Sequence, residues 1–448
     1  MTKEITEQAI AEFTKDLANH AGSNIAANAA QENGIYKASQ NTQSKIDLEP
    51  TFSVEIATGK PADQKQSGRC WMFSALNTMR HPMQKEYKIK DFELSQNYTN
   101  FWDKFEKSNW FFENVIASAN QPLGDRKVAF LFATPQQDGG QWDMLCGLIE
   151  KYGIVPKSVY PETANSNNSS ALNDTLNTLL RKDGLELREL VNAGKTDQEV
   201  EDRKNEMLND VFRILAISLG VPPTKFDFEY RDDDNNYHRE AGITPKAFFD
   251  KYVGMNLEDH VSIINSPTAD KPYHQVFSVE YLGNIVDGRQ VRHLNLEVAE
   301  MKDLIIKQLQ SGEVVWFGSN VGKDSERQLG LLDTKIYQRD QLFDIDLSMS
   351  KADKLDSGES MMDHAMVITG VDLVDDKPTK WKIENSWGDK PGFKGYFVMS
   401  DAWFDDFVYQ AVINKKFLSD KVKQEFDEGS KNPTQLLPWD PMGALAFK

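Results

Sequence analysis

Residues 64–74 read QKQSGRCWMFS, and they place Cys70 at the start of a predicted helix. Apolar residues recur from there at the spacing of one helix face, at Met72, Ala75, Leu76, Met79 and Met83. Ser67 and Gly68 are residue types typical of a helix start, and we expect them to cap it. A thiol in the first turn faces the positive end of the helix dipole, which favours the thiolate. The stretch therefore predicts a nucleophilic cysteine, although most cysteines outside disulfides are simply small buried hydrophobic residues.

Gln64 lies six residues before Cys70 and carries an amide that can donate a hydrogen bond. The backbone N–H of Cys70 is a second donor at the same point of the chain. Two such donors stabilise the negative oxygen that forms when a nucleophile attacks a carbonyl group. Gln64 is therefore a candidate oxyanion-hole residue.

A thiolate nucleophile needs a base, and one of the seven histidines has suitable surroundings. His364 begins a strongly apolar predicted strand in MDHAMVITG, and Asn385 ends a second one in WKIENSWGD, 21 residues further on. Two antiparallel strands of this length bring the two side chains together. The Asn385 oxygen would then accept from one ring N–H and aim the other nitrogen at Cys70. Trp387 would shield that hydrogen bond from water.

These motifs, in this order, resemble the catalytic set of the papain-like cysteine peptidases. SGRCW at 67–71 and WDPMGALA at 439–446 narrow the resemblance to the bleomycin hydrolase and bacterial aminopeptidase C branch. The resemblance covers most of the chain and implies a two-lobed α+β enzyme. Its helical lobe would carry Cys70, and an antiparallel, barrel-like β lobe would carry His364 and Asn385.

The same resemblance implies where a peptide substrate binds. Gly139 and Gly140, in the turn DGGQW, would form a wall of the cleft. The chain's end would lie in the half of the cleft that precedes the cleaved bond. Its terminus, near Ala446, would then face the free amino group of the substrate. The chain ends in Phe447-Lys448, beyond that point, so these residues are either trimmed or reach further into the site. The resemblance also implies a homohexamer with active sites on an inner channel.

The distance from Cys70 to His364 is 294 residues, whereas papain-type spacing is about 130–150 residues. We therefore expect an insertion of about 150 residues, mostly helical, with helices at 171–193, 198–219 and 245–253. The expected segments are an N-terminal helix and arm, the Cys70 lobe, the insertion, the β lobe and a C-terminal arm, at 1–60, 61–162, 163–260, 261–414 and 415–448. Residues 34–50 are expected to be extended. Three prolines predict that the tail from 432 onward is not helical.

Composition excludes several other classes of protein. The formal net charge is −18, so no basic field exists for a nucleic acid partner. Only two cysteines occur, which excludes a disulfide framework and indicates a reducing, cytoplasmic location. Cys146 is expected to be buried packing, and no apolar run is long enough for a membrane. Residues 232–236 lack the spacing of a calcium loop, and no metal or cofactor is expected.

The sequence therefore predicts a cysteine aminopeptidase that acts on peptides. An endopeptidase of the same fold is one alternative, and an inactive scaffold or binding protein is another. The intact set of candidate residues argues against the inactive protein. The residue preference at the cleaved bond stays open.

Overall fold

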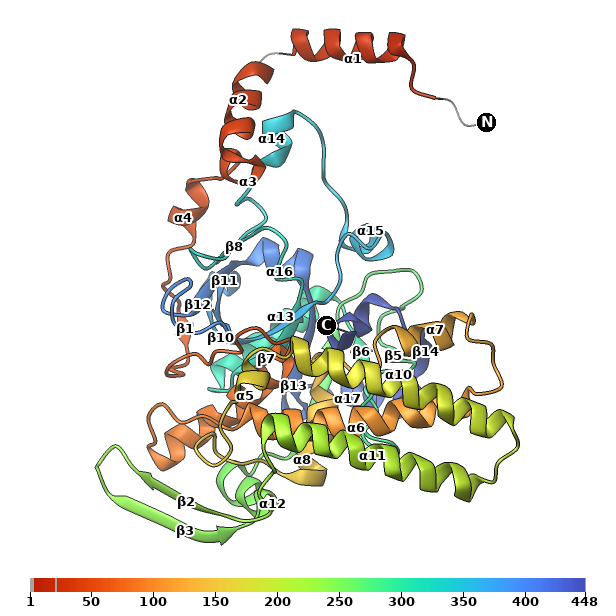
Figure 1. Ribbon diagram of the computed structural model, residues 1–448. Helices are drawn as coiled ribbons and strands as arrows, with labels where there is room; N and C mark the ends of the chain where they lie inside the picture. Colours follow the sequence, from red (N-terminus) through yellow and green to blue (C-terminus); the bar gives the residue numbers. More distant parts are fainter. Residues whose placement is uncertain (1–3, 21, 448) are drawn as a thin grey trace.

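Figure 1 shows the computed structural model of the protein. The structure describes residues 4–20 and 22–447. The central element is α5 (Cys70–Tyr87). It contacts the sheet strands β7 (Val315–Ser319) and β10 (His364–Val374) and also the helices α6 (Gln96–Ala117) and α8 (Trp142–Tyr152). A helix with protein on both sides is buried along most of its length, and the first turns of α5 are fully enclosed.

The start of α5 differs from the expected cap. Its N-cap residue is Arg69, and no side chain caps the helix there. The hydroxyl of Ser67 instead donates to the Gln64 carbonyl and accepts from Arg69 Nε. The expected Ser67 cap is therefore wrong, because the local turn already uses that hydroxyl.

The predicted long helices are present. α10 (Ser170–Asn192) and α11 (Asp197–Leu219) pack on α6, and the capping box of Thr196 and Glu199 starts α11. A shared apolar cluster joins the three helices, including Phe101, Phe112, Leu180, Val211 and Leu215. The shorter helices here are α7 (Arg126–Ala133), α9 (Ala164–Asn167) and α12 (Pro245–Phe248).

The predicted helix at 245–253 changes character halfway, because α12 continues as a π-helix over Phe249–Val253. Before it, β2 (Phe226–Arg231) pairs with β3 (Tyr237–Ile243) in a separate hairpin. The turn at 232–236 joins these strands, and β3 was not predicted. The division of the chain into five segments stays a prediction.

Within the described residues, twelve strands form one sheet in the order β14-β5-β6-β4-β13-β7-β10-β11-β12-β9-β8, with β1 beside β10. The remaining strands are β1 (Val54–Glu55), β4 (His260–Ile264), β5 (Val276–Val279), β6 (His293–Asn295), β8 (Ser325–Glu326), β9 (Leu331–Leu332), β11 (Lys377–Glu384), β12 (Tyr396–Ser400), β13 (Val408–Asn414) and β14 (Thr434–Leu436). From β4 through β13, β7, β10 and β11 to β12 the pairs are antiparallel, as expected. β4–β6, β9–β12 and β5–β14 are parallel, so the expected wholly antiparallel lobe is wrong at its margins.

Helices cover the other face of the sheet's central strands. α13 (Val298–Gln310) packs on β7, β10 and β13, and α16 (Asp401–Phe407) on β11, β12 and β13. The connection 320–360 contains β8, β9, α14 (Arg339–Phe343) and α15 (Lys351–Asp356). Among the described residues, no helix combines the length and apolar composition that a membrane crossing requires.

The N-terminal arm consists of helices and projects from the body (Figure 1). It comprises α1 (Glu7–Asn19), α2 (Ser23–Asn33), α3 (Ile35–Ala38) and α4 (Gln43–Asp47). Residues 34–50 are therefore not simply extended, which corrects the expectation. The apolar face of α1 is exposed, with Phe13 at 66% and Leu17 at 63% of their accessible surface.

The C-terminal tail is more structured than its three prolines predict. After a 3₁₀ turn at Lys415–Phe417 and α17 (Asp420–Gly429), β14 adds to the sheet edge beside β5. A 3₁₀-helix then runs over Pro441–Phe447, so the prediction of a non-helical tail is wrong there. A proline at the first position of a helix loses no helical hydrogen bond. The Asp440 carboxylate accepts from the Met442 N–H and caps the turn. Lys448 lies outside the described residues.

Candidate active site

The first turns of α5 are joined to the start of β10. The Ser74 hydroxyl, one turn after Cys70, donates to the carbonyl of Ala365, the residue after His364, at 2.8 Å. Both side chains of the candidate pair are buried, with Cys70 at 3% and His364 at 6% of their accessible surface. The hydrogen bond therefore fixes the helix of the cysteine against the strand of the histidine.

His364 and Asn385 meet as the spacing predicts. β10 and β11 are antiparallel neighbours, and His364 Nε2 lies 3.0 Å from Asn385 Oδ1. An amide oxygen only accepts hydrogen bonds, so Nε2 carries the hydrogen and Nδ1 is the basic nitrogen. The Trp387 ring lies 4.9 Å from the imidazole, centroid to centroid, and covers the pair.

Gln64 is tied to the segment that carries Asn385. Its Oε1 accepts from the Ser386 hydroxyl at 2.6 Å, and its backbone N–H donates to the Ser386 carbonyl at 2.8 Å. Its Nε2 donates to the Ser67 carbonyl at 2.6 Å, which uses one of the two amide hydrogens. The oxygen and nitrogen of the Gln64 amide are thus oriented. Sequence reasoning did not predict this role for Ser386.

The two glycines of the turn before α8 have different neighbours. A Cβ atom on Gly139 would lie 2.2 Å from the Leu445 carbonyl oxygen, whereas one on Gly140 would lie 2.5 Å from the Trp71 ring. Gly139 therefore faces the C-terminal tail, in which Ala446 is buried, while Gly140 makes room for the residue after Cys70. The structure therefore brings Gly139 and Ala446 together, as expected for two residues of one site.

Asp138 holds the loop before Cys70 and was not singled out from the sequence. One carboxylate oxygen accepts from the Gly68 N–H at 2.9 Å, and the other pairs with Lys104 Nζ at 2.8 Å. Burial alone would raise the pKa of Asp138, but Lys104 and the hydrogen-bond donors outweigh it and lower the pKa. The carboxylate therefore stays charged. The backbone carbonyl of Asp138 accepts a hydrogen bond from the Trp71 indole N–H at 2.7 Å.

Glu384, next to Asn385, is the second buried anion that sequence reasoning missed. Its Oε1 accepts from Asn77 at 3.0 Å and from Arg80 at 2.8 Å, and its Oε2 lies 3.0 Å from His81 Nε2. All three partners lie on α5. Burial would raise the pKa of Glu384, but His81 and Arg80 outweigh it and lower the pKa. This carboxylate joins the cysteine helix to the strand that ends at Asn385.

The other buried cysteine has a different environment. Cys146 lies on the apolar face of α8, and burial raises the pKa of its thiol well above the usual value. A thiol with a raised pKa is a poor nucleophile at neutral pH. The burial of Cys146 therefore agrees with the expectation that this residue contributes to the apolar core.

A large cavity does not coincide with the candidate site. It has a volume of about 1280 Å³ and is lined by the C-terminal half of α5 together with Trp142 and Trp316. Neither Cys70 nor His364 lines it. At the Gly139 turn the space is taken by the tail, since Met442 and Leu445 are fully buried there.

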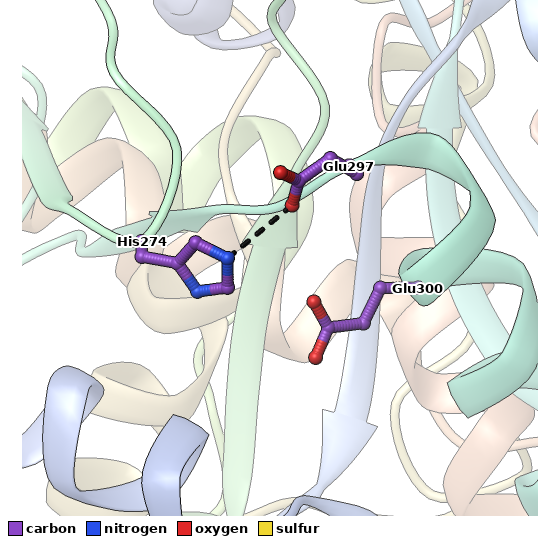
Figure 2. A group of neighbouring side chains, drawn as sticks. All are labelled: His274, Glu297 and Glu300. Carbon is purple, nitrogen blue, oxygen red and sulfur yellow. Dashed lines mark ion pairs between the residues drawn. The ribbon is translucent and has the colours of Figure 1, made fainter.

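Figure 2 shows a group of side chains that could in principle hold a metal ion, His274, Glu297 and Glu300. His274 Nε2 lies 3.4 Å from Glu297, and its Nδ1 lies 2.9 Å from Glu425 of α17. Glu297 is the N-cap of α13 and Glu300 is in its first turn, where the helix dipole stabilises carboxylates. Ion pairing and the dipole account for the group, and we assign no metal to it.

Residues 4–443 match the model of the Peptidase C1-like family. The chain is 79% identical to aminopeptidase C of Lactobacillus helveticus and 74% identical to that of Lactobacillus delbrueckii subsp. lactis, each over the full length of both proteins. The crystal structure of PepW from Lactobacillus rhamnosus HN001 superposes with a TM-score of 0.98 and 62% identity over 99% of both chains.

The helix of Cys70, packed on the hairpin of His364 and Asn385, thus belongs to a papain-like peptidase fold. More narrowly, the chain is a member of the Peptidase C1-like family. The resemblance found in the sequence is confirmed, as are the α+β class and the relation to the bacterial aminopeptidase C branch.

We predict that Glu384→Gln destabilises the protein at neutral pH by about 3 kcal/mol, because it leaves Arg80 buried without its anion. The folded-state pKa of Glu384 is lowered, so its contribution is present above the unfolded pKa of about 4.3 and is lost as the pH falls through the folded value. The difference from wild type should therefore shrink on acidification. Chemical denaturation at pH 7 and pH 3 measures it.

Glu55→Gln is the matched control. It removes the exposed carboxylate that pairs with Lys382, a residue on the same strand as Glu384. It should change stability by less than about 1 kcal/mol. A Glu384→Gln deficit that is the same at both pH values would contradict the prediction.

Proposed function

We propose that the chain is a cysteine aminopeptidase that releases N-terminal residues from peptides. Cys70, as a thiolate paired with protonated His364, attacks the peptide carbonyl. The proton on His364 Nδ1 passes to the leaving amine, and the resulting thioester is hydrolysed by a water that His364 deprotonates. The single observation that carries the proposal is the buried His364–Asn385 hydrogen bond beside the helix of Cys70.

Asn385 orients the base in this scheme and takes no part in proton transfer. Its oxygen fixes the tautomer in which Nδ1 can accept the thiol proton. Gln64 and the Cys70 N–H donate to the oxyanion. The bonds that bind Gln64 to Ser386 and Ser67 support this role, because they orient the amide before the substrate arrives.

The position of the tail supports an aminopeptidase over an endopeptidase. The backbone at Leu445 and Ala446 passes against Gly139, and we assign this contact to the part of the cleft that a longer substrate would need. A substrate with more than one residue before the cleaved bond would collide with the tail, whereas one with a single residue there would not. The names of the two Lactobacillus relatives are consistent with this activity.

Two other functions are less well supported. An inactive scaffold would have no need of the oriented His364–Asn385 pair or of the Gln64 contacts. A nucleic acid partner is opposed by the net charge of −18.

We also propose a cytoplasmic location, since Cys70 and Cys146 are not joined in a disulfide.

We further propose that the chain assembles as a homohexamer and that α1 contributes to its interfaces. None of the described residues of α1, α2 and α3 is buried within the chain. An isolated helix of 13 residues is marginally stable in water, so an exposed apolar face on α1 favours burial against another copy.

The proposed specificity is tested by deletion of residues 443–448. Wild type should cleave a peptide with a free amino terminus and leave its N-acetylated counterpart intact. Cys70→Ala should cleave neither peptide. The deletion should weaken the first activity and create the second, because it removes the segment that blocks longer substrates. Mass spectrometry of the products distinguishes the two. Strict dependence on a free amine in the truncated enzyme would contradict the role of the tail.

We predict that Gln64→Ala lowers kcat by about 10²-fold or more with little change in KM, because an oxyanion donor acts mainly in the transition state. Steady-state kinetics with a dipeptide amide measures both constants. Gln66→Ala is the control, since that neighbouring side chain instead accepts from Asn168 at the surface. A change in KM alone would assign Gln64 to substrate binding.

The role of α1 is tested by Phe13→Ser, which removes an exposed apolar side chain from its face. Light scattering during size-exclusion chromatography should show a smaller assembly than wild type. Lys15→Ser alters the opposite face of the same helix and should leave the mass unchanged. An unchanged mass for Phe13→Ser would exclude this face from the interface.

A further inference from the structure

The C-terminal arm, residues 434–447, is held at several points before it reaches Gly139. β14 pairs in parallel with β5, and the Glu280 N–H donates to the Leu436 carbonyl at 3.0 Å. Among the described residues, the arm leaves the sheet after β14. Gln141 Nε2 donates to the Met442 carbonyl at 3.3 Å. Side chains must therefore supply much of what keeps this part in place.

One of these contacts is a buried ion pair. Asp440 Oδ2 lies 2.8 Å from Lys271 Nζ, with the two side chains at 8% and 4% of their accessible surface. Lys271 also pairs with Asp270 at 2.8 Å. Burial alone would lower the pKa of Lys271, but the two carboxylates outweigh it and raise the pKa. Lys271 therefore stays charged at neutral pH, and loss of Asp440 would leave its buried ammonium with Asp270 alone.

The lysine is presented by a rigid loop. Asn295 of β6 donates from Nδ2 to the carbonyls of Ser266 and Lys271, at 2.9 and 2.6 Å, and its Oδ1 accepts from the Ser266 N–H at 2.9 Å. Asn295 is fully buried. Lys271 thus has a fixed backbone, which is what an anchor for a separate segment requires.

The residue beside Asp440 is held from another element. The Arg126 guanidinium lies 3.7 Å from the centre of the Trp439 ring, and the Phe130 ring lies 6.3 Å from it. Both of these partners belong to α7, whereas Lys271 belongs to the loop between β4 and β5. Consecutive arm residues are therefore attached to two parts of the protein that are distant in the sequence.

We propose that the Lys271–Asp440 ion pair, with the Arg126–Trp439 contact beside it, is the latch that keeps the arm in the cleft. These residues determine specificity without touching the substrate, because they set how often the arm leaves the part of the cleft that longer peptides need. The inference rests on the proposed function of the arm. It adds that the restriction to free amino termini depends on a side-chain pair located before the blocking residues 443–447.

The test is the ratio of cleavage rates for an N-acetylated peptide and for its unblocked counterpart. Asp440→Asn should raise this ratio by about tenfold or more, since loss of a buried ion pair shifts the arm toward the open state. Lys271→Met should act similarly, and Lys271→Arg should restore most of the wild-type ratio. A general loss of structure would lower both rates and leave the ratio unchanged.

Two further variants separate the possible outcomes. His274→Gln breaks a contact of the same loop with Glu425 of α17, away from Asp440, and should keep the wild-type ratio. Deletion of residues 443–448 provides the ratio for an absent arm. If that deletion raises the ratio while Asp440→Asn does not, the latch is refuted and the role of the arm stands. If neither raises it, the arm does not set specificity.

A second measurement does not depend on activity. Limited proteolysis should cleave the arm of Asp440→Asn faster than that of wild type, because proteases act on the detached form. Trp439→Ala should show the same change through its separate attachment to α7. Equal cleavage rates in wild type and in both variants would overturn the proposal.

Discussion

The site depends on a carboxylate that takes no part in the chemistry. Glu384 lies at the end of β11, and Asn77, Arg80 and His81 hold it from one face of α5. Its neighbour Asn385 contacts His364, so the same interaction fixes the helix of Cys70 against the hairpin of the proposed base. A buried carboxylate without these partners would be very costly, which makes this relative position of helix and hairpin the stable one. The Ser74–Ala365 hydrogen bond fixes the other end of the contact.

A second constraint is the close approach of backbones around the cleft. Gly139 lies where a Cβ atom would overlap the Leu445 carbonyl, and Gly140 lies where it would overlap the Trp71 ring. One glycine therefore admits the arm, and the next admits the helix of Cys70. Asp138, immediately before them, binds the Gly68 N–H. Three consecutive residues thus join the loop before Cys70, the helix of Cys70 and the arm.

Sequence patterns predicted those parts of the molecule that local order determines. The helix period after Cys70, the apolar strand of His364 and its spacing to Asn385 are each visible within a few residues. The roles of Glu384, Asp138 and Lys271 come from partners that are distant in the sequence, and an isolated charged residue gives no sign of its partner. The parallel strand pairs at the sheet margins were missed for the same reason, since pairing there depends on long connections. Prediction of the 3₁₀-helix in the tail would have required knowledge that the Asp440 side chain caps it.

In the proposed function, an arm that belongs to the same chain competes with substrate on unequal terms. Because β14 tethers it beside the cleft, its effective concentration there is on the order of millimolar, and a free peptide must exceed this to displace it. Apolar contacts of Met442 and Leu445 alone would let the arm exchange with any apolar peptide segment. The Lys271–Asp440 pair changes that balance, because a peptide that displaces the arm does not replace the lost partner of Lys271. Discrimination then comes from the cost of leaving the buried ammonium with Asp270 alone, and a substrate side chain offsets that cost only if it reaches Lys271 itself.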